Sequence, residues 1–259
     1  MSPLVHCLVF DIETVPDVEF GRRLLDLEGM SDAEVGEVMF ARRRQDTGGE
    51  FLSLEQHRVI AISVALRTRE TFRLWSLGDL DSSEADLISR FFEGIEKYTP
   101  DLISWNGSGF DLPVLHYRCL KHGIAAPRYW ETGDEDQTFR FNNYLNRFHW
   151  RHLDLMDVLA GYQNRGRAGL DAVSTLIGLP GKLGMAGDQV WAQYRAGNLQ
   201  GIRDYCETDV LNTYLVYLRF QLIRGHMSPP QHVAEIQRIR DYLAGQSAPH
   251  LQQFLAAWP

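Results

Sequence analysis

Two acidic residues stand two positions apart at the end of an apolar segment. Residues 4–10 are rich in Leu, Val and Phe, which predicts a buried strand, and Asp11 and Glu13 follow it directly. Because side chains alternate between the faces of a strand, both carboxylates are expected on one side, with Cα atoms about 6.5–7 Å apart. Two acids so placed repel each other. The pair therefore favours either a bound divalent cation or a strand end that is exposed to water.

A third acid follows another predicted strand. Residues 101–105 predict a short buried strand, an Asn-Gly-Ser-Gly turn covers 106–109, and Asp111 stands in the first turn of a helix predicted over 110–122. An Asp there, shortly before Pro113, is typical of helix capping. Functional crevices of open α/β sheets also lie beyond strand ends, and the small residues of the turn let a ligand approach the backbone. Both interpretations of Asp111 stay open.

A tyrosine and a fourth acid share one face of a later helix. Residues 199–223 predict a long helix, on which Tyr205 and Asp209 are spaced i, i+4 and therefore lie one turn apart. An acid on a buried helical face needs a partner, which would be an Arg, a helix N-terminus, or a metal shared with the first two acids. We interpret this face as the buried side of the helix because it also carries Ile202, Cys206, Val210, Thr213 and Tyr217.

The elements that must position these residues alternate between strands and helices, which indicates a mixed α/β layered fold over residues 1–224. Residues 17–56 are polar and helix-like, and we interpret them as an insertion or lid, with Arg42-Arg43-Arg44 as a solvated helix face. Residues 225–259 predict amphipathic helices packed on the same domain. The other predicted strands cover 58–66, 71–76 and 152–158, and the other predicted helices include 83–98 and 170–177.

The composition excludes several classes of protein. The chain has 259 residues, 44% of them hydrophobic, which is enough for one large domain with a sizeable core. No apolar run has transmembrane length and no secretory leader is expected, and three scattered cysteines fit a reducing compartment, so we expect a cytoplasmic protein. The net charge of −8 disfavours a tight non-specific duplex binder. This charge does not exclude an enzyme that binds a few nucleotides in a local groove.

Three short motifs, taken in order, resemble those of the DEDD (DnaQ-like) 3′–5′ exonuclease superfamily. Asp11-Ile12-Glu13 is similar to the first motif, residues 106–111 to the second, and Tyr205 with Asp209 to the third in its tyrosine form. The residues within these motifs most resemble those of the proofreading domain of family B DNA polymerases. They resemble more closely still the stand-alone predicted exonucleases related to that domain. The resemblance spans about residues 4–220. It implies a ribonuclease H-like fold, with a central mixed β-sheet flanked by helices.

The resemblance also implies a mechanism. A 3′–5′ exonuclease of this kind hydrolyses phosphodiester bonds at the 3′ end of single-stranded DNA with two Mg²⁺ ions, for which Mn²⁺ would substitute. Asp11 would bridge both ions, Glu13 and Asp209 would hold the ion that carries the attacking water, and Asp111 would anchor the second ion. Tyr205 would orient the water, because a free tyrosine has a pKa of about 10. Zinc is disfavoured, since no His or Cys cluster accompanies the acids.

Single strands are commonly held by stacking on aromatic rings and by Arg contacts to phosphates. Residues 139–153 combine three Arg and five aromatic side chains with no acid. The alternative for this segment is an amphipathic connector whose aromatic side chains fill the core. Residues 164–167 form a basic turn that could contact the backbone of a nucleic acid, and the alternative there is an ordinary loop. The candidate contacts to a nucleic acid are Asn106, Phe110, Arg147, Trp150, Arg165 and Arg167.

Three functions remain in competition. The leading hypothesis is an exonuclease acting on the 3′ ends of single-stranded DNA. A 3′–5′ exoribonuclease would use the same chemistry, and only contacts to the 2′-hydroxyl would distinguish it. A catalytically silent nucleic-acid-binding module is the third, although all four carboxylates and the tyrosine are present. An Asp-x-Asp phosphatase does not fit, because Glu13 replaces the second Asp.

Overall fold

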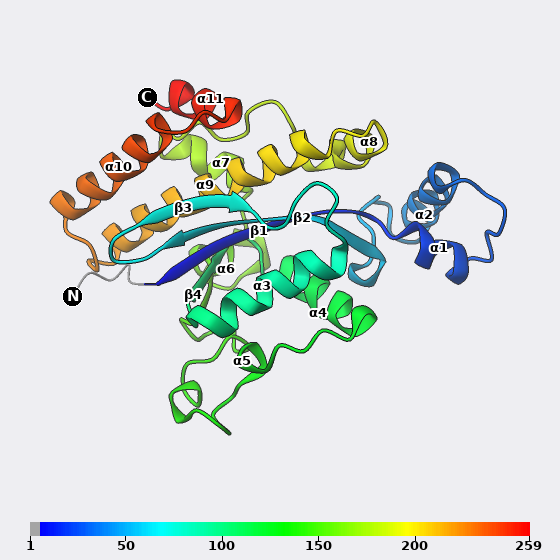
Figure 1. Cartoon of the computed structure of the whole chain (residues 1–259), viewed down its shortest axis with the longest axis horizontal. Coiled ribbons are helices and arrows are strands. Elements are labelled where there is room, and N and C mark those ends of the chain that lie inside the picture. Colours follow the sequence, from blue (N-terminus) through cyan, green and yellow to red (C-terminus); the bar gives the residue numbers. More distant parts are fainter. Residues whose placement is uncertain (1–5) are drawn as a thin grey trace.

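A five-stranded mixed sheet forms the centre of the computed structural model, which describes residues 6–259 (Figure 1). The strand order is β3-β2-β1-β4-β5, in which β1 runs antiparallel to β2 and parallel to β4. Residues 4 and 5 of the predicted first strand lie outside the described part of the chain. The strands are β1 (Cys7–Pro16), β2 (His57–Arg67), β3 (Phe72–Ser76), β4 (Asp101–Ser104) and β5 (His152–Asp154).

Helices cover both faces of this sheet, so the predicted α/β fold with a central mixed sheet flanked by helices is confirmed (Figure 1). Within residues 6–259, no helix combines the length and the apolar character that a membrane span requires. The helices are α1 (Val18–Leu24), α2 (Asp32–Thr47), α3 (Glu84–Tyr98), α4 (Asp111–His122), α5 (Pro127–Trp130), α6 (Leu155–Leu159), α7 (Leu170–Leu176), α8 (Val190–Arg195), α9 (Leu199–Ile223), α10 (Pro229–Ala244) and α11 (Pro249–Ala257).

The two faces of β1 belong to two different cores. Leu8 and Phe10 pack into the cluster that α3 and α4 complete on one face of the sheet. Cys7 and Val9 pack into the cluster of α9, α10 and α11 on the other face. Both faces are covered, which is why the start of β1 reads as a continuous apolar run.

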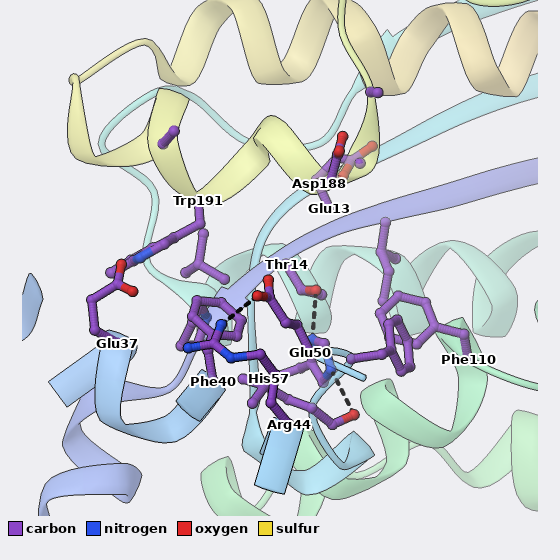
Figure 2. A pocket seen from close by; sticks show the side chains of 18 of the residues that line it. Glu13, Thr14, Glu37, Phe40, Arg44, Glu50, His57, Phe110, Asp188 and Trp191 are labelled. Carbon is purple, nitrogen blue, oxygen red and sulfur yellow. Dashed lines mark hydrogen bonds and ion pairs between the residues drawn. The ribbon is translucent and has the colours of Figure 1, made fainter. Parts of the chain in front are cut away.

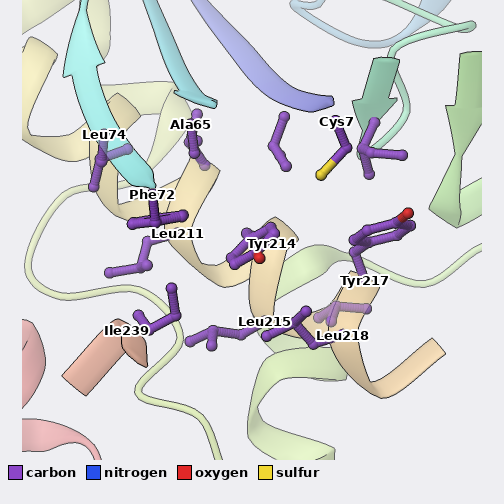
Figure 3. Packing of buried hydrophobic residues seen from close by; sticks show 14 of the residues in the cluster. Cys7, Ala65, Phe72, Leu74, Leu211, Tyr214, Leu215, Tyr217, Leu218 and Ile239 are labelled. Atoms are coloured by element: carbon purple, nitrogen blue, oxygen red, sulfur yellow. The ribbon is translucent and has the colours of Figure 1, made fainter. Parts of the chain in front are cut away.

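The core under α9 is built around aromatic side chains (Figure 3). Tyr214 is buried beneath β3, and its ring centre lies 5.0 Å from that of Phe72. Leu211 and Leu215 surround the pair in the same cluster. This packing fixes the position of α9 against the sheet, and with it the position of every side chain on the buried face of the helix.

The strand predicted over residues 152–158 is shorter than expected. β5 ends at Asp154, whose carboxylate accepts hydrogen bonds from the N–H groups of Met156 and Asp157 at 3.1 and 3.3 Å. An Asp that accepts these bonds starts a helix, so α6 begins where the strand was expected to continue.

The insertion at residues 17–56 folds into α1 and α2 around a small cluster of its own that includes Val35 and Met39. A capping box between Ser31 and Glu34 begins α2. At the start of the insertion, the buried Asp17 forms an ion pair with Arg118 of α4 at 2.6 Å. The insertion is thereby joined to the main core.

Residues 225–259 form α10 and α11, which pack along α9 (Figure 1). Leu243, Leu251 and Phe254 lie in the same buried cluster as α9. A buried ion pair between Arg67 of β2 and Glu235 of α10, at 2.6 Å, adds a polar link to the sheet.

Candidate active site

β1 directs two carboxylates toward the face of the sheet that α9 covers. Asp11 and Glu13 follow Cys7 and Val9 on this face, as the alternation of a strand requires. The pairing of β1 with β2 shifts between Glu13 and Thr14, which marks a β-bulge. Bulges re-aim side chains and are frequent beside functional sites. The regular ladder is thus interrupted at the second acid.

Asp111 begins α4 and contacts β1. The turn before it passes through Asn106, whose φ of 64° is left-handed and whose carbonyl accepts the Phe110 N–H at 3.0 Å. This turn leaves Asp111 buried, with its Oδ1 accepting a hydrogen bond from the Ile12 N–H at 3.2 Å. The bond places Asp111 beside the first two acids, which favours the interpretation as a site residue over helix capping.

α9 contributes a tyrosine, a thiol and a fourth acid. Tyr205 and Cys206 are buried and Asp209 is half-buried. The Cys206 Sγ lies 3.5 Å from the Asp11 Oδ2, and Asp11, Glu13 and Cys206 offer ligand atoms within 4.8 Å of one another. The sequence placed Cys206 on the buried face of the helix but did not predict this contact, because only the packing of α9 on β1 brings the two together.

Burial disfavours the ionisation of all four carboxylates, and at Asp11 and Glu13 the neighbouring acids add to the effect. Burial raises the pKa of Asp11 well above its usual range, and the charges of Asp111, Glu13 and Asp209 raise it further. Burial likewise raises the pKa of Glu13, with Asp209 and Asp111 adding to the effect. Burial raises the pKa of Asp111 to about 7 and that of Asp209 to about 6. Such mutual shifts concentrate at functional sites.

A lysine that was not among the predicted site residues also acts on these acids. The charge of Lys182 lowers the pKa of Glu13 and of Asp209, against the larger effect of burial. Its Nζ lies 5.9 Å from the centre of the Tyr205 ring. The Lys182 N–H donates to the Asp171 carboxylate at 2.8 Å, which holds the loop. No spacing rule relates a lysine in such a loop to acids elsewhere in the chain, so its position near them is a result of the fold.

A cavity of about 690 Å³ opens beside Glu13, with Phe110 at one end of it (Figure 2). The Phe110 ring centre lies 5.1 Å from that of His57. The Thr14 hydroxyl lies 2.8 Å from the His57 Nδ1. Burial lowers the pKa of His57 to about 4, so this ring is neutral at pH 7. The structure thus brings Phe110 and Glu13, one of the four acids, to the same cavity.

Two predicted contacts, Arg147 and Arg167, lie on the other side of the turn at residues 106–109. Each forms an ion pair with the buried Asp157 at 2.7 Å. Both line a small pocket of about 280 Å³ that also contains Ser108. The Asn106 N–H donates to the Asp154 carboxylate at 2.9 Å, so its backbone is held in the same region.

The remaining predicted contacts are Trp150 and Arg165. Trp150 packs near the C-terminal end of α9, where the Arg224 guanidinium lies 3.9 Å from its ring centre and Phe220 stacks at 6.5 Å. Phe220 is about three turns beyond Asp209, roughly 16 Å along the helix axis. Arg165 is exposed in a short turn. Contact of either residue with a nucleic acid stays a prediction.

Comparison with known families shows a match to a model described as a predicted 3′-5′ exonuclease related to the exonuclease domain of PolB. It matches residues 49–258. The matched range includes Asp111, Tyr205 and Asp209, and it begins after Asp11 and Glu13.

Similar curated proteins are DNA polymerases. The DNA polymerase of Pyrococcus glycovorans is 28% identical over 239 residues, which cover 86% of this chain and 30% of that protein. The DNA polymerase of Thermococcus kodakarensis is 26% identical over 237 residues, 86% of this chain and 14% of that protein. The catalytic subunit of DNA polymerase epsilon from Saccharomyces cerevisiae is 27% identical over 150 residues, 54% of this chain and 6% of that protein. The chain therefore spans less than a third of each relative.

Proposed function

This chain belongs to the family of predicted 3′-5′ exonucleases related to the exonuclease domain of PolB, and we propose that it removes nucleotides from the 3′ end of single-stranded DNA. The observation that carries the proposal is the meeting of Asp11 and Glu13 of β1, Asp111 of α4, and Tyr205 and Asp209 of α9. The similar proteins are DNA polymerases, which supports DNA as the polymer.

Two divalent ions fit this set of donors. Four carboxylates converge on one place with Lys182 as a nearby counter-charge, so the site has an excess of negative charge that a cation would neutralise. Oxygen donors suit Mg²⁺, for which Mn²⁺ would substitute. Bound there, two such ions would polarise the scissile phosphate and stabilise the charge that develops during an in-line displacement. All four carboxylates would hold these ions, and Asp11, on which the charges of the other three act, would be central to the set.

Tyr205 and Lys182 would act on the substrate directly. Burial raises the pKa of Tyr205 far above its usual value, and the charges of Asp209 and Glu13 raise it further. The hydroxyl therefore stays protonated and would orient the attacking water rather than deprotonate it. Lys182 would contact the phosphate as a positive charge. Water attacks phosphorus and gives up a proton to solvent, the bond from phosphorus to the 3′ oxygen of the preceding nucleotide breaks, that oxygen takes up a proton, and the terminal nucleoside 5′-monophosphate leaves.

One assay tests the function. Single-stranded DNA and RNA of the same sequence, labelled at the 5′ end, are incubated with the protein and Mg²⁺, Mn²⁺ or EDTA. We expect a ladder of DNA products that shorten from the 3′ end with either metal and no products with EDTA. A ladder on RNA alone would assign an exoribonuclease. Intact substrate with every metal would contradict the proposal and favour the silent binding module.

Metal binding should depend on pH with a defined sign. The raised pKa values of Asp111, about 7, and of Asp209, about 6, mean that the metal-free protein holds protons near pH 6 that it has lost at pH 8. A cation must displace these protons. We therefore expect the rise in melting temperature on adding Mg²⁺ to be larger at pH 8 than at pH 6.

The difference between melts with Mg²⁺ and with EDTA at each pH isolates this effect. His57 and His152 are buried and His116 is half-buried, and desolvation lowers the pKa of each to about 4, so they destabilise the fold as the pH falls below their unfolded value near 6.5. Their contribution is common to both melts and cancels. A Mg²⁺ effect that is equal at both pH values would contradict the prediction.

A further inference from the structure

The cavity beside Glu13 has a wall that the insertion builds. β1 forms its floor from Ile12 to Pro16, and Lys182 and the segment that leads into α8 form one side. The insertion closes another side with Glu37, Phe40, Arg44, Glu50, Phe51 and Leu52. In Figure 2, Phe110 lies at one end of the cavity, while Trp191 and Glu37 lie at the other.

Phe51 leaves an aromatic surface uncovered at this wall. Its side chain is 63% exposed, although its ring centre lies 5.3 Å from that of Phe110 and 5.4 Å from that of His57. The three rings form one aromatic wall. An uncovered ring beside a cavity offers stacking to a flat ligand, and stacking on aromatic side chains is how unpaired bases are held.

The backbone around Phe51 is held in place before any ligand arrives. The Arg43 Nε donates to the Phe51 carbonyl at 2.7 Å, and Arg44 forms an ion pair with Glu50. The next residue, Leu52, is buried in the small core of the insertion. A surface fixed in this way loses little conformational entropy when it binds, so contact area converts more fully into affinity.

The far end of the cavity is narrowed by a contact between α2 and α8. A Cβ at Gly36 would lie 2.8 Å from the Trp191 ring, so glycine permits the close approach of the two helices. Arg195 and Glu37 add an ion pair at 3.9 Å. The resulting volume of about 690 Å³ is typical of small-ligand pockets, so it suits a nucleotide and not a base-paired end.

We propose that Phe51 stacks on the base of the 3′-terminal nucleotide and that the insertion thereby selects unpaired ends. The inference rests on the proposed exonuclease function and adds a specificity-determining residue to it. The base lies against Phe51 and Phe110, while the phosphate on its 5′ side reaches the acids beside Glu13. A base-paired end cannot enter until its last nucleotide is unpaired.

Kinetics with matched substrates tests the assignment. Phe51→Ala should raise KM for single-stranded DNA about tenfold, as loss of one base stack predicts, with kcat within about twofold. Phe51→Trp should restore KM, since the ring is retained, and Phe51→Leu should not. Tyr98→Ala, an exposed aromatic at the end of α3, serves as the matched control and should leave KM unchanged.

A substrate without a terminal base distinguishes stacking from a general loss of packing. On DNA that ends in an abasic nucleotide, the wild type and Phe51→Ala should have the same KM, because nothing remains to stack. A Phe51→Ala effect of equal size on both substrates would overturn the proposal. So would an unchanged KM on the ordinary substrate.

A binding measurement keeps this test separate from the test of the function. A single-stranded probe with 2-aminopurine at its 3′ end is titrated with the protein in EDTA, where no hydrolysis occurs. Stacking should quench its fluorescence with the wild type and not with Phe51→Ala. Quenching without cleavage in metal would refute the nuclease and leave the stacking site standing. Absent or equal quenching with the two proteins would overturn the stacking site, whatever the cleavage assay gives.

Discussion

Asp11→Asn is expected to lower metal-dependent cleavage by about a thousandfold or more while the protein stays folded. Bound metal ions supply several kcal/mol of stabilisation to a phosphoryl-transfer transition state, and each 1.4 kcal/mol is about a factor of ten. Asp11 is the acid on which the other three carboxylates all act, so its loss disturbs every proposed metal contact. The measurement is the initial rate on 5′-labelled single-stranded DNA with saturating Mg²⁺.

Two control measurements make this prediction specific. In EDTA the variant should melt at the same temperature as the wild type or higher, because one of four mutually repelling charges has been removed. Asp204→Asn is the matched control, since Asp204 lies on α9 beside Tyr205 but bonds to Gln200 at 2.7 Å. Its rate should remain near that of the wild type. Cleavage by Asp11→Asn within tenfold of the wild-type rate would refute the assignment.

Arg118→Met should destabilise the fold by about 3–5 kcal/mol, the usual effect of removing one partner from a buried ion pair. The Arg118 side chain is 3% exposed and lies between two buried carboxylates. It donates to Asp17 at 2.6 Å and to Glu84 at 2.7 and 2.6 Å. Methionine fills a similar volume but leaves both acids with less counter-charge in a dry environment.

Urea unfolding measures the loss of stability. Arg90→Met is the control, because Arg90 of α3 forms an exposed i, i+4 pair with Asp86 at 3.0 Å and its loss should cost less than about 1 kcal/mol. Equal effects of the two substitutions would refute the buried network as a source of stability. Because Asp17 begins the insertion, Arg118→Met should also weaken the aromatic wall that contains Phe51.

Local sequence patterns predicted most elements of this fold, since apolar periodicity and turn residues act within a few positions. They failed at residues 155–158, where the Asp154 carboxylate ends β5 by accepting helical N–H groups. A strand and a capped helix both fit an apolar run there. The placement of Asp111 against Ile12 and of Lys182 near Tyr205 was beyond such patterns.

In the candidate site, too, local patterns were predictable and contacts between distant segments were not. Spacing alone placed Asp11 and Glu13 on one face of a strand, and the resemblance to a family related the other acids to them. Phe51 was not predicted, because its contact with Phe110 depends on how the insertion returns to β2. Trp150 and Arg165 were chosen for residue type, and residue type does not determine distance from the acids. Their contact with nucleic acid, like the roles of the acids, awaits the experiments above.

The hydrogen bonds within the site connect segments that are far apart in the sequence, and this determines when the site can form during synthesis. The Ile12 N–H bonds to a side chain 99 residues later, and Asp11 is contacted by a thiol 195 residues later. Contacts so distant in sequence form late in folding, after the costly closure of long loops. A chain leaving the ribosome N-terminus first therefore has no complete acidic cluster until α9 has emerged and docked. The fold itself therefore delays assembly of the proposed site until synthesis has passed Asp209.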